Sequence, residues 1–306
     1  MIYLLALLLG LVQGVAEFLP ISSSGHLSLA EEVLSKVFGD SNRALQGSEF
    51  SIAVHVGTLG SIVIVYWQRL LAAATNVRLI TLVVVATLPV VFTGLLLKDQ
   101  IEALMTQPRA VGVALLATAA FLAAIGPIER WHRSRRESSA PPRTTAVPQQ
   151  TTPGEEAEAE LLDDTSHGNA NRDADSPAGR TMDTMTWLDA LIVGLVQSIA
   201  IVPGISRSGS TIFAGVLAGM DRRAAADFSF FIAIPAIAGA AVLAVKDVVE
   251  AGRSDVAADV LCWGAVVALV TGLVSLKVLL ALVAQGRLIW FSVYCAIVGL
   301  AAIALT

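Results

Sequence analysis

Several apolar stretches of this chain approach the length of a helix that crosses a membrane. Residues 80–97 and 110–125 are predominantly apolar, and a bilayer core of roughly 30 Å needs about 20 such residues in a helix. The chain is 55% hydrophobic and 15% charged, with a mean hydropathy of +0.73, which is too apolar for a soluble protein of 306 residues. The sequence therefore predicts an all-α integral membrane protein.

The first segment, residues 1–19, is also apolar, and we interpret it as part of the mature fold. It begins without basic residues, and Gln13 and Glu17 interrupt the stretch that a signal peptide keeps apolar. Both cysteines, Cys262 and Cys295, lie in apolar segments. They are expected to serve in packing rather than in a disulfide or a metal–thiolate site.

A hydrophilic stretch at residues 132–185 divides the apolar chain. It is rich in Ser, Thr, Pro and Gly and supplies many of the carboxylates behind the net charge of −5. Such a stretch buries too little apolar surface to offset the entropy of ordering it. We therefore predict a disordered acidic loop at 132–185, a first membrane half at 1–131 and a second at 186–306, which together form one membrane domain. A docking segment is the alternative for the loop.

The two halves resemble each other in sequence. Residues 10–25 align without gaps with residues 194–209, sharing Gly-Leu-Val-Gln, an Ala, Ile-Ser and Ser-Gly. Further on, Glu49-Phe-Ser is echoed by Asp227-Phe-Ser. The chain is therefore interpreted as an internal duplication.

Arginine positions predict how the halves are oriented. Arg69 and Arg78 flank one short loop and an arginine cluster begins the long loop, so both loops are expected on the cytoplasmic side. The two aligned motifs each hold a break and a second arm too short to cross, which predicts two re-entrant helical hairpins. About six transmembrane helices complete an inverted repeat, with spans expected near 49–66, 78–97, 108–127, 227–245, 256–282 and 286–305. Broken helices of inverted repeats meet near the midplane around a polar cavity.

Arg207 lies in Pro203-Gly-Ile-Ser-Arg-Ser-Gly-Ser-Thr211, at membrane depth. An arginine there costs about 2.5–3.5 kcal/mol on insertion scales, so it calls for an anionic partner. A phosphate fits, because the guanidinium binds two oxygens and the neighbouring hydroxyls and a helix start add donors. The alternative is an ion pair between Arg207 and Glu17 that only holds the hairpins together.

The first motif supplies the complementary chemistry. Gln13 and Glu17 share a helix face, where they can hold a divalent cation with phosphate oxygens, or Glu17 can act as a base. Ser22, Ser23 and Ser24 follow the Pro20 break, and His26 can take a proton or attack phosphorus. The alternatives are a helix–helix hydrogen bond for Gln13 and helix capping for the serines. His55 is expected to support the site or to pack.

These motifs resemble those of the undecaprenyl-diphosphate phosphatase family, the bacitracin-resistance type. The likeness rests on Gln13-x-x-x-Glu17, Ser23-Ser-Gly-His26 and Pro203-Gly-x-Ser-Arg-Ser-x-x-Thr211, and it extends to Phe228-Ser-Phe and Pro235. It implies hydrolysis of a polyprenyl diphosphate to the monophosphate and inorganic phosphate, recycling the lipid carrier for envelope polymers. It also implies a divalent cation, Mg²⁺ or Ca²⁺, a site that opens to the outer face of the cell membrane, and often a homodimer.

Residue roles follow from the same resemblance. Glu17, Ser23, His26 and Arg207 take catalytic positions, and Gln13 and Glu17 take the metal position. Gln13 is neutral where the family also has Glu, which weakens its case as a metal ligand. The substrate-binding positions are Ser22, Ser24, Gly204, Ser206, Ser208 and Thr211.

A transporter or flippase for polyprenyl phosphate is the rival function, since inverted repeats around a midplane arginine also suit alternating access. Transport needs only a phosphate binder, whereas hydrolysis also needs a nucleophile and a proton donor, which Ser23 and His26 beside Glu17 can supply. A purely structural membrane protein is a more distant alternative. The expected partners are the lipid substrate and the bilayer, with no nucleic acid.

Overall fold

The computed structural model describes residues 1–38, 45, 47–105, 107–139, 179–251 and 256–305, and the elements within them are helices. Residues 140–178, most of the predicted acidic loop, lie outside the described part. The helices in chain order are α1 (Ile2–Phe18), α2 (Ser23–Phe38), α3 (Ser48–Ala74), α4 (Val77–Leu96), α5 (Lys98–Met105), α6 (Pro108–Ser139), the 3₁₀ turn η3 (Met182–Thr184), α8 (Trp187–Ile199), α9 (Arg207–Leu217), α10 (Arg222–Ala251), α11 (Ala258–Ala284) and α12 (Ile289–Leu305).

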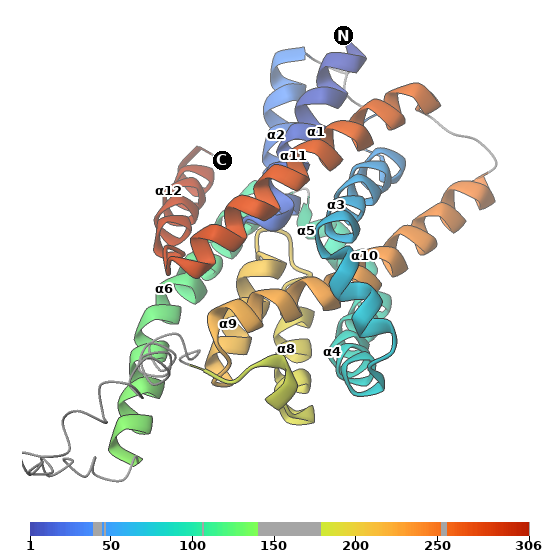
Figure 1. Cartoon of the computed structure of the whole chain (residues 1–306). Helices are drawn as coiled ribbons and strands as arrows, with labels where there is room; N and C mark the ends of the chain where they lie inside the picture. Colours follow the sequence, from blue (N-terminus) through green and yellow to red (C-terminus); the bar gives the residue numbers. More distant parts are fainter. Residues whose placement is uncertain (39–44, 46, 106, 140–178, 252–255, 306) are drawn as a thin grey trace, which may run out of the picture.

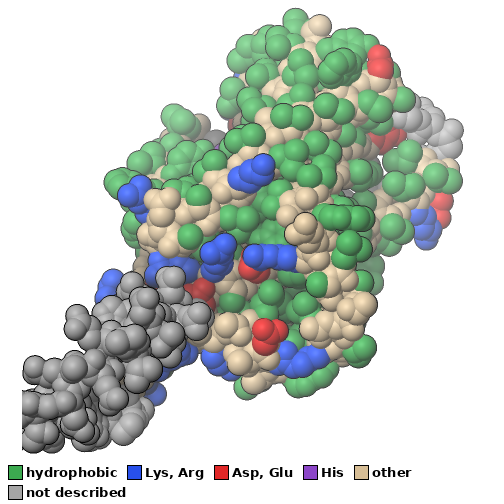
Figure 2. Space-filling model, viewed as in Figure 1, with side chains coloured by type: hydrophobic (Ala, Val, Ile, Leu, Met, Phe, Trp, Pro, Cys, Tyr) green, Lys and Arg blue, Asp and Glu red, His purple; other side chains and the backbone are tan. Residues whose placement is uncertain are grey.

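Five helices of the described chain are long and apolar enough to cross a bilayer: α3, α4, α6, α10 and α11. The sixth predicted span is α12, which has 17 residues and reaches the short end of the usual range. The prediction of an all-α membrane protein with about six spans is confirmed. Figure 2 shows the corresponding surface, on which hydrophobic side chains cover much of the visible face and charged ones gather mostly in its lower half.

Two helical hairpins complete the fold, one from α1 and α2 and the other from α8 and α9 (Figure 1). Their tips meet, because Gly204 donates its N–H to Ser22 Oγ at 3.1 Å. Ser22 has φ of 70°, in the left-handed region that non-glycine residues rarely adopt. Its hydroxyl also accepts from Gly25 N at 3.3 Å, so hydrogen bonds from both hairpins hold the strained residue in place.

The hairpins pack in a way that matches the inverted repeat. The first arm of each half lies on the fourth helix of the other half, α1 on α11 and α8 on α4. Equivalent glycines make both approaches close: a Cβ on Gly10 would lie 2.7 Å from the Gly264 carbonyl oxygen, and one on Gly194 would lie 2.6 Å from that of Ala86. Small residues at such crossings let helix backbones approach in membranes.

Helix α6 continues to Ser139, into the stretch that the sequence assigned to the loop from residue 132. Its charged end is anchored on the second hairpin, where His132 Nε2 lies 3.2 Å from the Leu217 carbonyl and Arg136 donates to that of Gly219. These side chains bind carbonyls near the C-terminal end of α9 that the helix leaves free. Helix α6 therefore extends beyond its apolar residues because polar contacts with the second hairpin stabilise its last turns.

Candidate active site

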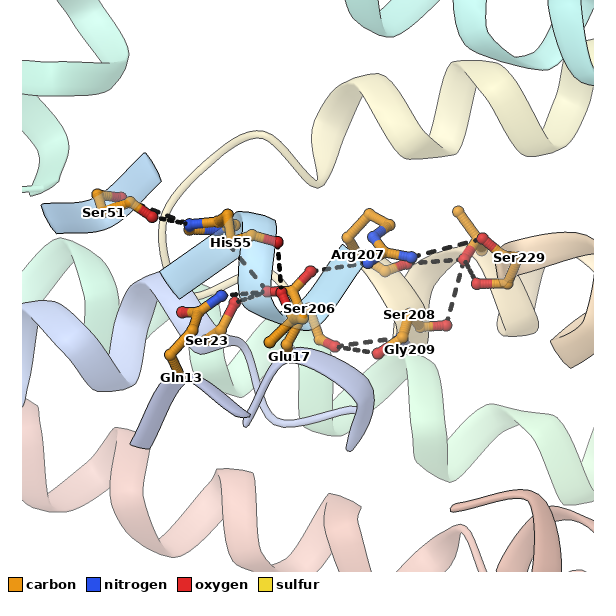
Figure 3. Close-up of polar contacts among 12 residues, drawn as sticks. Gln13, Glu17, Ser23, Ser51, His55, Ser206, Arg207, Ser208, Gly209 and Ser229 are labelled. Atoms are coloured by element: carbon orange, nitrogen blue, oxygen red, sulfur yellow. Dashed lines mark hydrogen bonds and ion pairs between the residues drawn. The ribbon is translucent and has the colours of Figure 1, made fainter. Parts of the chain in front are cut away.

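Glu17 lies at the centre of a polar cluster between the two hairpin tips (Figure 3). It is near the end of α1 and is 8% exposed. Oε2 accepts hydrogen bonds from Gln13 Nε2 at 2.9 Å and Ser23 Oγ at 2.6 Å, and Oε1 accepts one from Arg207 Nη2 at 2.8 Å. A carboxylate at membrane depth is costly to ionise alone, so these donors stabilise its charge.

Arg207 begins α9 and reaches across from the second half of the chain. Besides Glu17, its guanidinium donates from Nη1 to the Ser229 carbonyl at 3.4 Å. The ion pair with Glu17, weighed above as a purely structural alternative, is therefore present. The ion pair does not occupy all the N–H groups of the guanidinium. Arg207 also lines a cavity, and its remaining N–H groups can bind an anion there.

The hydroxyls of the first tip lie at the cavity as the sequence predicts. Ser22, Ser23 and Ser24 all line it, and the hydroxyls of Ser22 and Ser24 lie 3.4 Å apart. Ser23 Oγ is the one that donates to Glu17. A hydroxyl hydrogen-bonded to a carboxylate is an arrangement of nucleophile and base.

The second tip divides its predicted residues between cavity and support. Ser206 lines the cavity and caps α9, because its Oγ accepts from Gly209 N at 3.1 Å. Gly204, Ser208 and Thr211 were predicted to bind substrate but do not line the cavity. Thr211 Oγ1 instead donates to the Arg207 carbonyl at 2.8 Å. These three residues therefore belong to the structure of the second tip and do not face the cavity.

Thr118 of α6 completes this support. Its hydroxyl donates to the Gly204 carbonyl at 3.0 Å and accepts from Ser206 N at 2.9 Å. Gly204 has φ of 98°, which glycine adopts without strain. A Cβ there would lie 2.5 Å from the Val111 carbonyl oxygen, so both backbone shape and space require glycine.

His26 lies outside the cavity. Its Nδ1 is 2.9 Å from the Ser22 carbonyl and its Nε2 is 2.8 Å from the Tyr294 hydroxyl on α12, against whose ring it stacks. The sequence predicted this histidine as an acid–base or nucleophilic group beside Ser23. In the structure its ring instead contacts α12 through Tyr294 and does not line the cavity that holds Glu17.

His55 is the histidine that lines the cavity, together with Ser51 one turn earlier on α3. Its Nε2 lies 3.8 Å from Glu17 Oε2, and its Nδ1 is 2.7 Å from the Ser51 carbonyl. From the sequence, His55 was expected only to support the site or to pack. A signal that could have found it is the repeated Phe-Ser block, which ends at Ser51 and at Ser229.

The serine of this repeated block makes an equivalent contact in the two halves. The Ser51 carbonyl holds His55 Nδ1, and the Ser229 carbonyl holds Arg207 Nη1. Each carbonyl thus orients one nitrogen-bearing side chain toward Glu17. The duplication has produced a site in which the same backbone position supports two different functional groups.

The cavity has a volume of about 330 Å³. Its polar wall is formed by the residues just described, from both hairpins and α3. The remaining wall is apolar apart from one glutamine and is formed by Ala16, Ile52, Val90, Gln197, Ala200, Ile201, Ile205, Ala236, Ile237, Ala240 and Ala241. A cavity lined by a charged, hydroxyl-rich cluster and by a largely apolar remainder fits a ligand that is itself polar at one end and apolar beyond it.

The expected divalent cation does not fit Gln13 and Glu17 as a resident ion. Mg²⁺ and Ca²⁺ take roughly six to eight oxygen ligands, but both Glu17 oxygens already accept from N–H or O–H groups. Gln13 points its amide N–H at Glu17, which leaves its Oε1 buried without a partner and away from the cavity. No three His, Cys, Asp or Glu side chains of the described chain converge as a metal site. We therefore assign neither residue as a metal ligand.

Comparison with known proteins places this geometry in a family. The family model described as bacitracin resistance protein BacA matches residues 6–301. The chain belongs to the BacA family. Similar BacA-like relatives include the undecaprenyl-diphosphatase of Rhodopirellula baltica, 37% identical over 295 residues, and that of Carboxydothermus hydrogenoformans, 34% identical over 298 residues. Each alignment covers 96% of this chain and 94% of the relative, so the BacA likeness includes both hairpins and the cavity.

Proposed function

We propose that this chain is an undecaprenyl-diphosphatase, which hydrolyses a polyprenyl diphosphate in the membrane to the polyprenyl phosphate and inorganic phosphate. The observation that carries the proposal is the cluster of Glu17, Ser23 and Arg207 at the end of a cavity whose other wall is apolar. The names of the relatives agree with it. The reaction recycles the lipid carrier on which envelope polymers are built. The name of the family connects the chain with bacitracin resistance.

The cavity suits the two ends of such a substrate. Arg207 and the positive start of α9 attract the diphosphate, and the Ser22, Ser24 and Ser206 hydroxyls offer hydrogen bonds to its oxygens. The isoprenoid chain stays against the apolar wall and in the lipid. Removing it to water would cost about 0.8 kcal/mol per CH₂ group, so a site within the bilayer avoids that cost.

Two nucleophiles suit the geometry. Ser23 Oγ already donates its proton to Glu17, so it can attack the terminal phosphorus while Glu17 takes that proton. A water molecule bound in the cavity is the second candidate. In either case Arg207 stabilises the charge that spreads over the phosphoryl oxygens in the transition state. His26, the third candidate from sequence, does not line the cavity and has its Nε2 at the Tyr294 hydroxyl, so we prefer the other two.

The orientation follows from the arginine distribution. Arg69, Arg78 and the arginines at the end of α6 lie near the ends of spans that we place on the cytoplasmic side. The residue 132–185 segment is then cytoplasmic and the cavity opens toward the outer face. A homodimer is a further part of this proposal, carried by family resemblance.

The direct test is phosphate release from long-chain polyprenyl diphosphate by the purified protein in detergent, with Mg²⁺, Ca²⁺ or a chelator. The wild type should release phosphate, and Glu17→Gln and Arg207→Ala should each lose about 10²-fold or more in kcat/KM. Glu250→Gln and Arg109→Ala, at exposed positions, serve as matched charge controls.

The same assay distinguishes hydrolysis from the rival function, transport of polyprenyl phosphate. A folded wild type that releases no phosphate across chain lengths, yet moves polyprenyl phosphate between the leaflets of vesicles, would support the transporter instead. The geometry favours hydrolysis, because a transporter has no use for a hydroxyl held on a carboxylate beside the phosphate-binding arginine.

A further inference from the structure

His55 is a polar side chain in a membrane-spanning helix that the proposed mechanism has not yet used. Its side chain is 29% exposed, toward the cavity that holds Glu17 and Arg207. A histidine at membrane depth is costly unless it has partners or a function. Glu17 and the Ser51 carbonyl are its partners, and their positions decide what the ring can do.

The Ser51 carbonyl fixes the form of the neutral ring. A carbonyl oxygen only accepts hydrogen bonds, and it lies 2.7 Å from His55 Nδ1. The ring proton of neutral His55 therefore sits on Nδ1, where it donates to Ser51, and Nε2 keeps its lone pair. Since Nε2 is the atom that lies 3.8 Å from Glu17, the free lone pair faces the cluster (Figure 3).

His26 provides an internal comparison. Its Nδ1 is held in the same way by the Ser22 carbonyl, but its Nε2 contacts the Tyr294 hydroxyl, and neither residue lines the cavity. The two histidines thus have the same ring form but different partners at Nε2. Only the lone pair of His55 is directed at the place where phosphate chemistry would occur.

We propose that His55 is a catalytic base of this enzyme, which takes the proton of the attacking water at Nε2. The inference rests on the proposed phosphatase function. One water molecule must attack phosphorus whether it acts directly on the diphosphate or hydrolyses a phosphate first transferred to Ser23. In that step a new O–P bond forms and one water proton passes to Nε2. The bond to the leaving oxygen breaks, and its electron pair stays on the polyprenyl phosphate or on Ser23, which then takes back the proton that Glu17 accepted and leaves Glu17 ionised.

The surroundings stabilise the charged ring that results. The charged or titrating groups facing His55 from the cavity wall are Glu17 on α1 and Arg207 on α9. The wall from α4, α8 and α10 is otherwise apolar apart from Gln197. The negative Glu17, 3.8 Å from Nε2, stabilises the imidazolium that forms, while the Ser51 carbonyl keeps the ring oriented. Afterwards the proton leaves with the released phosphate.

The test compares the wild type with His55→Ala and His55→Gln in the phosphate-release assay. Both variants should lose about 10²- to 10⁴-fold in kcat with little change in KM. The gap left by His55→Ala should let added imidazole restore part of kcat, and His55→Gln, which fills that gap, should not respond. His132→Ala removes a histidine at the far end of α6 and should show neither effect.

The folding of each variant is measured separately from its activity. Each variant is checked by thermal unfolding in detergent, so that a loss caused by unfolding is recognised. A folded His55→Ala protein with kcat within about threefold of wild type, or with a full loss that imidazole does not change while the pH–rate profile keeps its wild-type shape, would overturn the role of His55. An inactive wild type would instead overturn the proposed function, which keeps the two failures distinct.

Discussion

Charge at the site is balanced residue by residue. Glu17 and Arg207 form an ion pair of 2.8 Å, one from each half of the chain, and Gln13 adds an N–H donor without adding charge. The side chains of the site therefore have little net charge to attract a free cation, whereas a bound diphosphate carries several negative charges. We infer that a divalent cation enters as a partner of the diphosphate rather than as a resident ion.

Gln13→Glu is expected to create a resident cation site, because two carboxylates one helical turn apart would then face each other. Binding of ⁴⁵Ca²⁺ to the purified protein, measured by equilibrium dialysis, should be weak for wild type unless a non-hydrolysable diphosphate is present. It should be at least about tenfold tighter for Gln13→Glu alone, since two carboxylates bind Ca²⁺ better than one.

Gln197→Glu is the matched control, because Gln197 occupies the equivalent place in the second half, where Ile201 replaces Glu17. Its single carboxylate should not raise cation affinity. Tight Ca²⁺ binding by the wild type without diphosphate would contradict our assignment and restore Glu17 as a metal ligand.

At the scale of the helices, close backbone contact joins each hairpin to the other half. Gly194 on α8 meets the backbone of Ala86 on α4, with less than 3 Å available for a Cβ. Backbone cannot move aside as a flexible side chain can, so a methyl group there must separate the two helices.

Gly194→Ala should therefore destabilise the protein by about 1–3 kcal/mol and shift the second hairpin that carries Arg207. The control is Gly239→Ala on α10, whose Cβ would meet nothing within 4 Å and which should be neutral or slightly stabilising. Thermal unfolding in detergent measures both. Equal midpoints for the two variants would show that the α4–α8 contact is looser than the structure has it.

Helix α8 begins at a capping box that contains a buried carboxylate, that of Asp189. Asp189 accepts from Thr186 N and Oγ1, both at 2.7 Å, and from Arg180 Nη2 at 2.8 Å. Burial alone would raise the pKa of Asp189, but these hydrogen bonds from Thr186 and Arg180 outweigh it and lower the pKa below its ordinary value. The ionised form of Asp189 is therefore stabilised more in the folded state than in the unfolded state.

Asp189→Asn should accordingly reduce stability at pH 7, by about 1–3 kcal/mol for hydrogen bonds to a charged group. A carboxyl with a lowered folded-state pKa contributes stability above its unfolded value near 4 and loses it as pH falls through the folded value. The difference in unfolding midpoint between wild type and variant should shrink as pH falls below about 4. A difference that stays constant with pH would exclude the charge of Asp189 as its source.

For the whole molecule, the sequence could predict most of the architecture but only part of the site. Apolar length and the aligned motifs were sufficient for the spans, hairpins and inverted repeat, because a bilayer leaves few alternatives for the backbone. The placement of the two histidines was not predictable. His26 is close to Ser23 in sequence but faces α12, and His55 comes from a separate helix, so only three-dimensional packing decides which one reaches Glu17.

The same packing makes the two halves depend on each other. Since α1 lies on α11 and α8 lies on α4, the first arm of each hairpin packs on the other half, and without the other half Glu17 and Arg207 each lose the oppositely charged partner of their ion pair. A buried charge without its partner costs several kcal/mol. Each half alone is therefore expected to be unstable.

Expressing residues 1–139 and 179–306 as two separate chains tests this dependence. Co-expressed halves should co-purify through a tag on one of them and regain phosphate release, because the contacts that hold the hairpins run between the halves rather than through the connecting segment. Glu17→Gln in the first chain should weaken the association, since Arg207 of the second chain then loses a charged partner. Halves that purify separately as folded proteins would show that each repeat is self-sufficient, and the exchanged packing of α1 and α8 would lose its role in assembly.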